Sequence, residues 1–348
     1  MNSRERVIKT YNLQLPDRVP IDFCADNLVY NSLMEKVGVR SQLELMEHLH
    51  IDFRWAKPKW IGPELKTHDG IKTDFLGIPR EGVCFGFAVR NPLADIETIK
   101  DVEDYNWPLP AYWDYDIYVE EAKRFWEEGY AVYGGQESWL LIAACDLVGF
   151  EKFMMLMINN PELANKVLEK LTDFFIGCSK IMFEKGKGYV NIFLNGDDFG
   201  HQHGPLISLA LWRRLVKPHI KRIFAVAKEY GLLITHHSCG SISLFLDDLI
   251  EIGLDAIEPI QVSAYNMDFE SLVKRFKGRV VLHGSIDTQK TLPFGTVDDV
   301  RQEVISRIRL FKDQGGFVIG PSQHLLTEIP LDNILTMYQT AYEFGVIN

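Results

Sequence analysis

The sequence predicts a closed (β/α)8 barrel, the TIM-barrel fold, built from a single domain over residues 1–348. Short apolar or β-branched runs alternate with amphipathic segments of helical period, which is typical of a parallel sheet covered by helices. Eight such runs occur, and eight is the number of strands in this barrel. An open doubly wound sheet is the alternative, but no run is followed by a glycine-rich phosphate-binding motif such as G-x-G-x-x-G.

The predicted strands and helices follow one another along nearly the whole chain. The strands are expected near residues 18–23, 51–56, 130–136, 190–195, 232–237, 254–259, 279–285 and 316–320. Helices are expected between them, for example at 207–229, 241–252, 267–277, 296–313 and 331–345. In the last of these, apolar residues recur from Ile334 to Ala341 at the i, i+3, i+4, i+7 spacing of a core-facing helix.

The stretch near residues 58–110 departs from this alternation. It is rich in glycine, proline and aromatic residues and fits neither a helix nor a barrel strand. We predict an inserted β-meander with loops over the top of the barrel. No linker, internal repeat or low-complexity tract is visible, so the insertion belongs to the same domain.

Composition and charge exclude several classes of protein. With 47% hydrophobic and 24% charged residues, the chain has the composition of an ordinary globular protein with a large core. No apolar run approaches the length of a membrane span, and the start lacks the apolar segment of a signal peptide, so a cytoplasmic protein is predicted. The net charge of −11 argues against nucleic acid and membrane surfaces as partners. The cysteines form no C-x-x-C pair, which favours a reducing compartment; they are Cys24, Cys84, Cys145, Cys178 and Cys239.

Functional residues of such a barrel gather where the strands end. Polar residues follow every predicted strand, namely Asp22 and Cys24, Lys57, Gln136 and Glu137, Asn195 to Asp198, His236 to Cys239, Glu258 with Gln261, His283 with Asp287, and Ser322 to His324. The strand bodies are far less polar. The active site is therefore predicted at this end of the barrel.

The most informative of these segments is His237-Ser238-Cys239-Gly240. In an extended segment residues i and i+2 point to the same side, so His237 and Cys239 are aimed at a common point while His236 points away. Imidazole and thiolate are both zinc ligands. The spacing alone also permits a hydrogen-bonded core histidine beside a small apolar cysteine.

Carboxylates are the other candidates for catalysis or metal binding. Asp197 and Asp198 precede a long polar turn and are expected to act as a general acid or base, although an aspartate there also serves as a turn or helix cap. Glu258 is a candidate third metal ligand, with a salt bridge or substrate contact as the alternative. Glu137 is predicted to be a carboxylate of the pocket.

Further polar and aromatic residues are expected to bind the substrate. The predicted polar contacts are Asp22, Gln202, Gln261 and His283. Trp55, Tyr133 and Trp139 suit a substrate that carries a ring, although aromatic residues at these spacings are equally typical of a core.

A series of short motifs runs in order along the chain. They are NSRERV at 2–7, PDRVP at 16–20, GDDFG at 196–200, GPLIS at 204–208, HSCGS at 237–241, IDTQ at 286–289, LPFGT at 292–296 and PxDNI at 330–334. In this order and spacing they resemble the uroporphyrinogen decarboxylase-like superfamily, which also contains zinc-dependent corrinoid and coenzyme M methyltransferases. The resemblance implies a (β/α)8 barrel, in agreement with the strand count.

Two branches of this superfamily differ in their motifs. True uroporphyrinogen decarboxylases carry an arginine-rich signature for the porphyrinogen carboxylates, whereas residues 20–26 here read PIDFCAD without an arginine. The methyltransferase branch carries H-x-C, matched by His237 and Cys239, and a further zinc ligand after the last strand. That ligand falls on Gln323, with His324 next to it as the alternative, and Glu258 is another way to complete the site.

The resemblance therefore implies a zinc-dependent methyltransferase. It would demethylate a small compound of methoxy, methylamine or betaine type and transfer the methyl group to the cobalt of a corrinoid (cobalamin) carried by a partner protein. Zinc bound by one thiolate and one imidazole is a stronger Lewis acid than zinc bound by two thiolates, which suits a poor leaving group. In this hypothesis Asp197, Asp198 and Glu137 position the substrate or manage its proton, and a homodimer is permitted. The alternatives are a decarboxylase and a non-catalytic barrel that binds the corrinoid protein.

Overall fold

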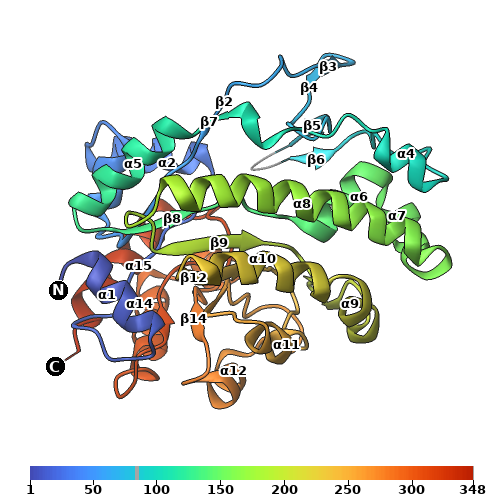
Figure 1. The fold of residues 1–348 in the computed structure, drawn as a ribbon. Coiled ribbons are helices and arrows are strands. Elements are labelled where there is room, and N and C mark those ends of the chain that lie inside the picture. The colour runs from blue at the N-terminus through green and yellow to red at the C-terminus, as the bar shows by residue number, and fades with distance from the viewer. Residues whose placement is uncertain (83–85, 348) are drawn as a thin grey trace.

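The fold is a barrel of parallel strands, as Figure 1 shows for the computed structural model, which describes residues 1–82 and 86–347. Within these residues a seven-stranded curled sheet has the order β1-β8-β9-β12-β13-β14-β15. Its strands are β1 (Phe53–Trp55), β8 (Ala131–Gly134), β9 (Ile192–Gly196), β12 (Leu233–His237), β13 (Ala256–Glu258), β14 (Val281–His283) and β15 (Phe317–Val318). Each overlaps a predicted strand, and every pairing between neighbours is parallel. The predicted (β/α)8 barrel is confirmed.

The eighth position of the barrel is filled by the segment around Ile21. Ile21 forms an isolated parallel bridge with Ile319, and Asp52 donates its backbone N–H to the Ile21 carbonyl at 2.9 Å. The segment thus lies between β15 and β1, where a strand over 18–23 was predicted. It does not form a continuous ladder because Pro20 has no N–H and the Ile21 N–H is taken by the Asp52 side chain at 2.8 Å.

A buried ionic cluster holds this closure together. Asp52 is fully buried and accepts hydrogen bonds from Arg6 Nη1 at 2.7 Å and from Arg18 Nη1 at 2.8 Å. Arg6 also pairs with Asp17 at 2.7 Å, so the chain start is tied to the same point. A buried carboxylate is stable only when its charge and lone pairs are satisfied, and here two guanidinium groups and a backbone N–H satisfy them.

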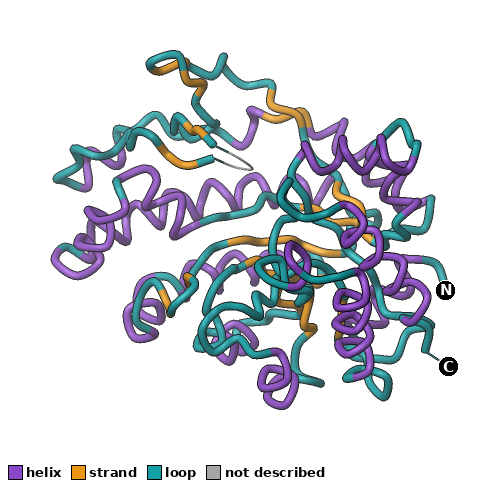
Figure 2. The backbone as a smooth tube through the Cα atoms, turned by 180° about the vertical axis from the view of Figure 1, so that it is seen from behind, coloured by secondary structure: helices purple, strands orange, loops and turns teal. Residues whose placement is uncertain are grey.

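The helices surround this sheet (Figures 1 and 2). They are α1 (Ser3–Tyr11), α2 (Asn27–Val37), α3 (Gln42–His48), α4 (Ile99–Glu103), α5 (Tyr115–Glu127), α6 (Leu140–Val148), α7 (Phe150–Asn159), α8 (Pro161–Lys185), α9 (Leu209–Leu215), α10 (Lys217–Glu229), α11 (Leu246–Glu251), α12 (Phe269–Phe276), α13 (Thr291–Phe294), α14 (Val297–Arg309) and α15 (Leu331–Phe344), with the short 3-10 helix η1 (Pro110–Tyr112). The helix predicted over 207–229 is divided into α9 and α10. Pro218 explains the division, because proline is tolerated in the first turn of a helix and not in its interior.

None of the helices in the described part of the chain combines the length and apolar character that crossing a membrane requires.

The insertion after β1 lies along the outside of α8 (Figure 1). It consists of short antiparallel strand pairs with loops between them, and an antiparallel bridge between Thr73 and Pro79 joins two of the pairs in the manner of the predicted β-meander. The pairs are β2 (Lys59–Trp60) with β7 (Trp113–Asp114), β3 (Thr67–His68) with β4 (Ile71–Lys72), and β5 (Arg80–Glu81) with β6 (Phe87–Ala88); β10 (Gly200–His201) and β11 (Gly204–Pro205) form a further pair after β9. Prolines and left-handed glycines such as Gly70 and Gly77 break the insertion into these pieces. Cys84 lies outside the described residues.

Candidate active site

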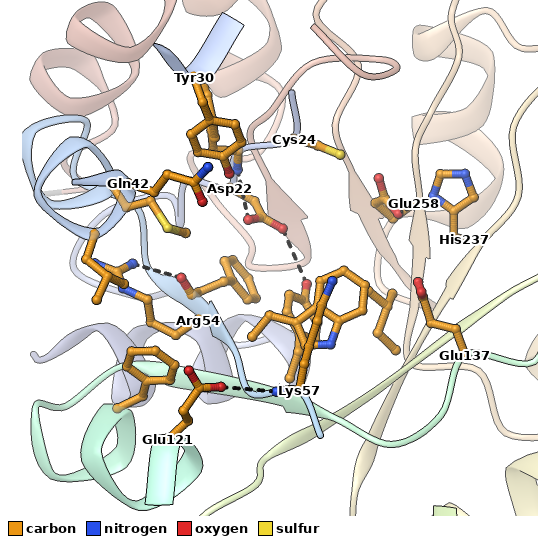
Figure 3. A pocket seen from close by; sticks show the side chains of 18 of the residues that line it. Asp22, Cys24, Tyr30, Gln42, Arg54, Lys57, Glu121, Glu137, His237 and Glu258 are labelled. Atoms are coloured by element: carbon orange, nitrogen blue, oxygen red, sulfur yellow. Dashed lines mark hydrogen bonds and ion pairs between the residues drawn. The ribbon is translucent and has the colours of Figure 1, made fainter. Parts of the chain in front are cut away.

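A cavity of about 460 Å³ lies where several barrel strands end (Figure 3). Its lining includes charged, aromatic and sulfur-containing side chains from β1, β8, β12 and β13, from the segment 22–24 and from helices α2, α3 and α5. The lining residues are Asp22, Phe23, Cys24, Tyr30, Gln42, Leu43, Met46, Phe53, Arg54, Trp55, Lys57, Glu121, Arg124, Phe125, Tyr133, Glu137, Trp139, Leu194, His237, Glu258 and His324. Several residues from the predicted strand ends line this cavity, namely Asp22, Cys24, Lys57, Glu137, His237, Glu258 and His324.

His237 and Glu258 form an ion pair in this cavity. They end neighbouring parallel strands and face each other in the register of β12 with β13, so the two side chains meet directly. The distance from His237 Nδ1 to Glu258 Oε2 is 2.7 Å. Burial opposes the charged form of each group, but the partner's charge prevails: it holds the pKa of His237 well above its usual value and lowers that of Glu258 to about 2.

Cys239 joins the same cluster through its side chain. Its thiol shares a hydrogen bond with His237, as the i, i+2 spacing predicts, and its backbone N–H donates to Asp198 Oδ1 at 2.8 Å. Gly240 follows with φ of +78°, and a Cβ atom there would lie 2.6 Å from the Gly200 carbonyl carbon, so glycine is required for this turn. His236 points away from the cavity, as predicted, and its Nδ1 lies 2.8 Å from Asn195 Nδ2.

The donor set of this cluster fits zinc in its chemistry. An imidazole, a thiol and a carboxylate are joined by hydrogen bonds whose shared protons a metal ion would replace. In residues 1–82 and 86–347, however, no three His, Cys, Asp or Glu side chains are arranged so that they could hold a metal ion together. The donor types therefore match zinc, but their arrangement in the described residues does not form a complete ligand set.

The two candidates after the last strand are placed differently. His324 lines the cavity, and its charge is close enough to influence the pKa of Glu258. Gln323 is not part of the lining; its Oε1 accepts the backbone N–H of His324 at 3.0 Å. Of the two candidates for the last metal ligand, His324 therefore lies at the cavity, and Gln323 contacts His324 without lining the cavity.

The neighbouring aspartates Asp197 and Asp198 do not act on the cavity together. Asp197 is fully buried, and its carboxylate accepts backbone N–H groups of Leu141, at 2.7 and 2.9 Å, and of Ile142, at 3.1 Å. These are unpaired donors at the start of α6, which a carboxylate satisfies well. The expected catalytic aspartate is therefore placed as a helix cap, while Asp198 positions the Cys239 backbone.

The Asp197→Asn variant is expected to lose about 1–3 kcal/mol of unfolding free energy, because one carboxylate oxygen that accepts backbone N–H groups is lost. Urea denaturation followed by circular dichroism measures this. An unchanged stability together with a large fall in activity would instead assign Asp197 a direct role in the reaction.

Glu137 is the cavity carboxylate with a pKa suited to proton transfer. Burial raises the pKa of Glu137 to about 7, although Lys57, His237 and a hydrogen bond from Trp139 lower it in part. A carboxyl group of this kind exchanges a proton readily near neutral pH. Trp139 has a left-handed backbone with φ of +37°, a strained conformation, and its ring lies 5.2 Å from that of His237.

Of the four predicted polar substrate contacts, Asp22 alone is among the described residues that line the cavity, whereas the three predicted aromatic contacts, Trp55, Tyr133 and Trp139, all line it. His283 is 3% exposed and lies behind Asp22, with Nε2 at 3.1 Å from Asp22 Oδ2. Gln202 and Gln261 hydrogen bond to each other at 3.0 Å, and Gln261 Oε1 accepts the Gly240 N–H at 2.8 Å. They join the loops after β9, β12 and β13 and shape the turn at Cys239 without reaching the substrate space.

Several lining residues escaped the sequence analysis. Gln42 and Met46 come from α3, Glu121 and Arg124 from α5, and Tyr30 from α2. These helices reach the cavity from the side, away from the strand ends where the polar residues of the site were expected. Their sequences are those of ordinary amphipathic helices, so no local signal marks them.

The family comparison covers most of the chain. A model of the family described as "Uroporphyrinogen decarboxylase (URO-D)" matches residues 89–344. A solved structure described as a methyltransferase from Methanosarcina mazei superposes with a TM-score of 0.71 at 19% sequence identity, covering 99% of each chain. This likeness supports the barrel fold.

The curated relatives match over shorter stretches. A uroporphyrinogen decarboxylase from Mycolicibacterium paratuberculosis is 25% identical over 162 residues, which are 43% of this chain and 42% of that protein. One from Thermus thermophilus is 25% identical over 192 residues, 53% and 50% of the two chains. The chain spans about half the length of the curated relatives it matches.

Proposed function

This chain belongs to the uroporphyrinogen decarboxylase family, and we propose that it is a methyltransferase that passes a methyl group from a small methylated compound to the cobalt of a partner protein's corrinoid. The observation that carries the proposal is the hydrogen-bonded cluster of His237, Cys239 and Glu258, of which His237 and Glu258 line the cavity together with Glu137. Such a cluster combines metal ligands with a group able to supply a proton. The absence of arginine from residues 20–26 argues against a porphyrinogen substrate.

The cavity residues divide the work of methyl transfer between them. His237 and Cys239, with Glu258 or His324, would hold zinc, which supplies a Lewis acid for the heteroatom that carries the methyl group. When the methyl–heteroatom bond breaks, the methyl group passes to cobalt and the heteroatom keeps the electron pair. An oxygen from a neutral methoxy donor then takes a proton from Glu137, whereas the nitrogen of an ammonium donor leaves as a neutral amine. Trp139 and Trp55 line the cavity and shield this transfer from water.

The test is methyl transfer to cob(I)alamin by purified protein with measured zinc content. Methoxylated aromatics, methylamines and betaines would be offered in turn, and methylcobalamin would be followed by its absorbance. A protein that contains no zinc, together with an unchanged transfer rate in the Cys239→Ala variant, would contradict the proposal.

With a methoxy donor, the rate of methyl transfer is expected to fall as pH rises through about 7, because Glu137 loses its proton there. Glu137→Gln should slow the reaction by about a hundredfold and remove the dependence of the rate on pH.

The same residue makes the stability of the chain depend on pH. The folded chain binds the proton of Glu137 more tightly than the unfolded chain does. The stabilisation from this proton is complete below the ordinary carboxyl pKa and is lost as pH rises through 7. The variant should therefore gain relative stability above pH 7, which thermal unfolding at several pH values measures. If the pH–rate profile is the same in Glu137→Gln as in the unchanged protein, Glu137 is not the group that supplies the proton.

Decarboxylation is a second candidate, favoured by the cations Lys57 and Arg124 in the cavity lining, which suit a carboxylate. Release of carbon dioxide without methylcobalamin formation would support it. Formation of methylcobalamin without carbon dioxide would exclude it.

A further inference from the structure

Asp22 is a cavity carboxylate without a Lys or Arg partner in the described part of the chain. Its Oδ2 lies 3.1 Å from His283 Nε2 and 3.5 Å from the Tyr133 hydroxyl, and its Oδ1 accepts the Phe23 N–H at 2.8 Å. The side chain is 20% exposed and lines the cavity. A half-buried carboxylate with no guanidinium or ammonium partner leaves a negative charge available to a cationic ligand.

His283 holds this carboxylate in place from behind. Its Nδ1 is buried and has no hydrogen-bond partner among the described residues. Its other ring nitrogen, Nε2, contacts Asp22 Oδ2 at 3.1 Å, so Asp22 is the side chain that His283 holds. The ring itself is fixed by stacking on Phe53, with centroids 5.7 Å apart.

The cations in the cavity lining are engaged elsewhere. Arg54 lies over the ring of Tyr130 at 3.7 Å and donates to the carbonyl oxygens of Ile51 and Phe53. The Lys57 ammonium lies 3.6 Å from the ring centroid of Trp55. The Arg124 guanidinium lies over the ring of Phe125 at 4.6 Å. None of these three cations forms an ion pair with Asp22 in residues 1–82 and 86–347, so the charge of Asp22 is left for the substrate.

Aromatic rings surround this corner of the cavity. Phe23 and Tyr30 meet edge to face at 4.8 Å, and Phe53 and Tyr133 stack at 5.1 Å; all four line the cavity. In Figure 3 the Asp22 carboxylate lies between Tyr30 and the His237–Glu258 pair. Aromatic faces and a carboxylate together attract an organic cation, most strongly one with methylated nitrogen.

From this geometry we infer that the Asp22 corner binds an alkylammonium group, so that the methyl donor is a methylated amine, with Asp22 as the cation-binding residue and His283 as its positioning residue. The inference rests on the proposed function, since it names the donor of that reaction. It also excludes the methoxy compounds, whose methylated atom is uncharged, and retains the methylamine and betaine compounds, which carry a positively charged nitrogen.

Calorimetric titration of the purified chain, without corrinoid, with choline and with its uncharged tert-butyl analogue tests this inference. The two probes have the same shape, so charge alone separates them. Choline should bind at least about tenfold more tightly than the analogue. Asp22→Asn should weaken choline binding by about tenfold or more and leave binding of the analogue unchanged. Glu121→Gln, which removes the same charge from another wall of the cavity, is the matched control and should change choline binding less than about twofold.

His283 variants test the positioning role. His283→Leu should weaken choline binding severalfold, whereas His283→Gln should retain most of the binding because its amide can donate to Asp22. In the Asp22→Asn background, His283→Leu should weaken choline binding no further.

Three outcomes would overturn the inference. They are equal affinity for both probes, no measurable choline binding, or an unchanged choline affinity in Asp22→Asn. If choline binds as expected but no amine is demethylated, the proposed function fails and the subsite stands. If neutral methoxy compounds are demethylated and Asp22→Asn has no effect on choline, the subsite fails alone.

Discussion

The His237→Ala variant is expected to lose bound zinc and to transfer methyl groups at least about a hundredfold more slowly. The reason is that His237 is the centre of the cluster: it contacts Glu258 at 2.7 Å and shares a hydrogen bond with Cys239. Zinc per chain, measured by mass spectrometry after equilibrium dialysis, reports on binding apart from activity. His203→Ala changes an exposed histidine of the loop after β9 and is the matched control, with zinc content unchanged.

The same measurement identifies the residue that completes the site. His324→Ala should lower zinc affinity, whereas Gln323→Ala should have a smaller effect, because only His324 lines the cavity. Full zinc occupancy in His237→Ala would contradict the proposed ligand set. A larger loss in Gln323→Ala than in His324→Ala would reverse the assignment of the last ligand.

The Asp52→Ala variant is expected to lose about 3–5 kcal/mol of unfolding free energy, the usual cost of breaking a buried charge cluster from one side. The substitution would leave the buried Arg18 and Arg6 guanidinium groups without their shared carboxylate and the Ile21 N–H without its acceptor. Because these contacts close the barrel between β15 and β1, the loss should be global. Chemical denaturation measures it.

Asp298→Ala is the control for this prediction. It removes a carboxylate that pairs with Arg301 on the surface of α14, and exposed pairs contribute about 0–1 kcal/mol. Equal stability of the two variants would show that the cluster around Asp52 does not hold the barrel closed.

The site could be predicted from the sequence only where its signal is local. The i, i+2 spacing placed His237 and Cys239 on one side and His236 on the other, because side chains alternate along any extended segment. Glu258 was a candidate at the right strand end, but its contact with His237 depends on the register between β12 and β13. Gln202, Gln261 and Asp197 were expected at the site because polar residues at strand ends all look alike in sequence. The structure uses their side chains to satisfy backbone and loop groups instead.

The sequence by itself determined the order of strands and helices, the barrel and the end of the barrel that carries the polar residues, because apolar periodicity is a property of neighbouring residues. Only the tertiary structure decided which polar groups meet. It placed His283 behind Asp22 and α3 and α5 over the cavity, and turned Asp197 toward α6. It also closed the barrel through the Ile21 segment and Asp52. These contacts join residues far apart in the chain, and their partners are selected by packing and by the need to satisfy buried charges and N–H groups, which no local pattern encodes.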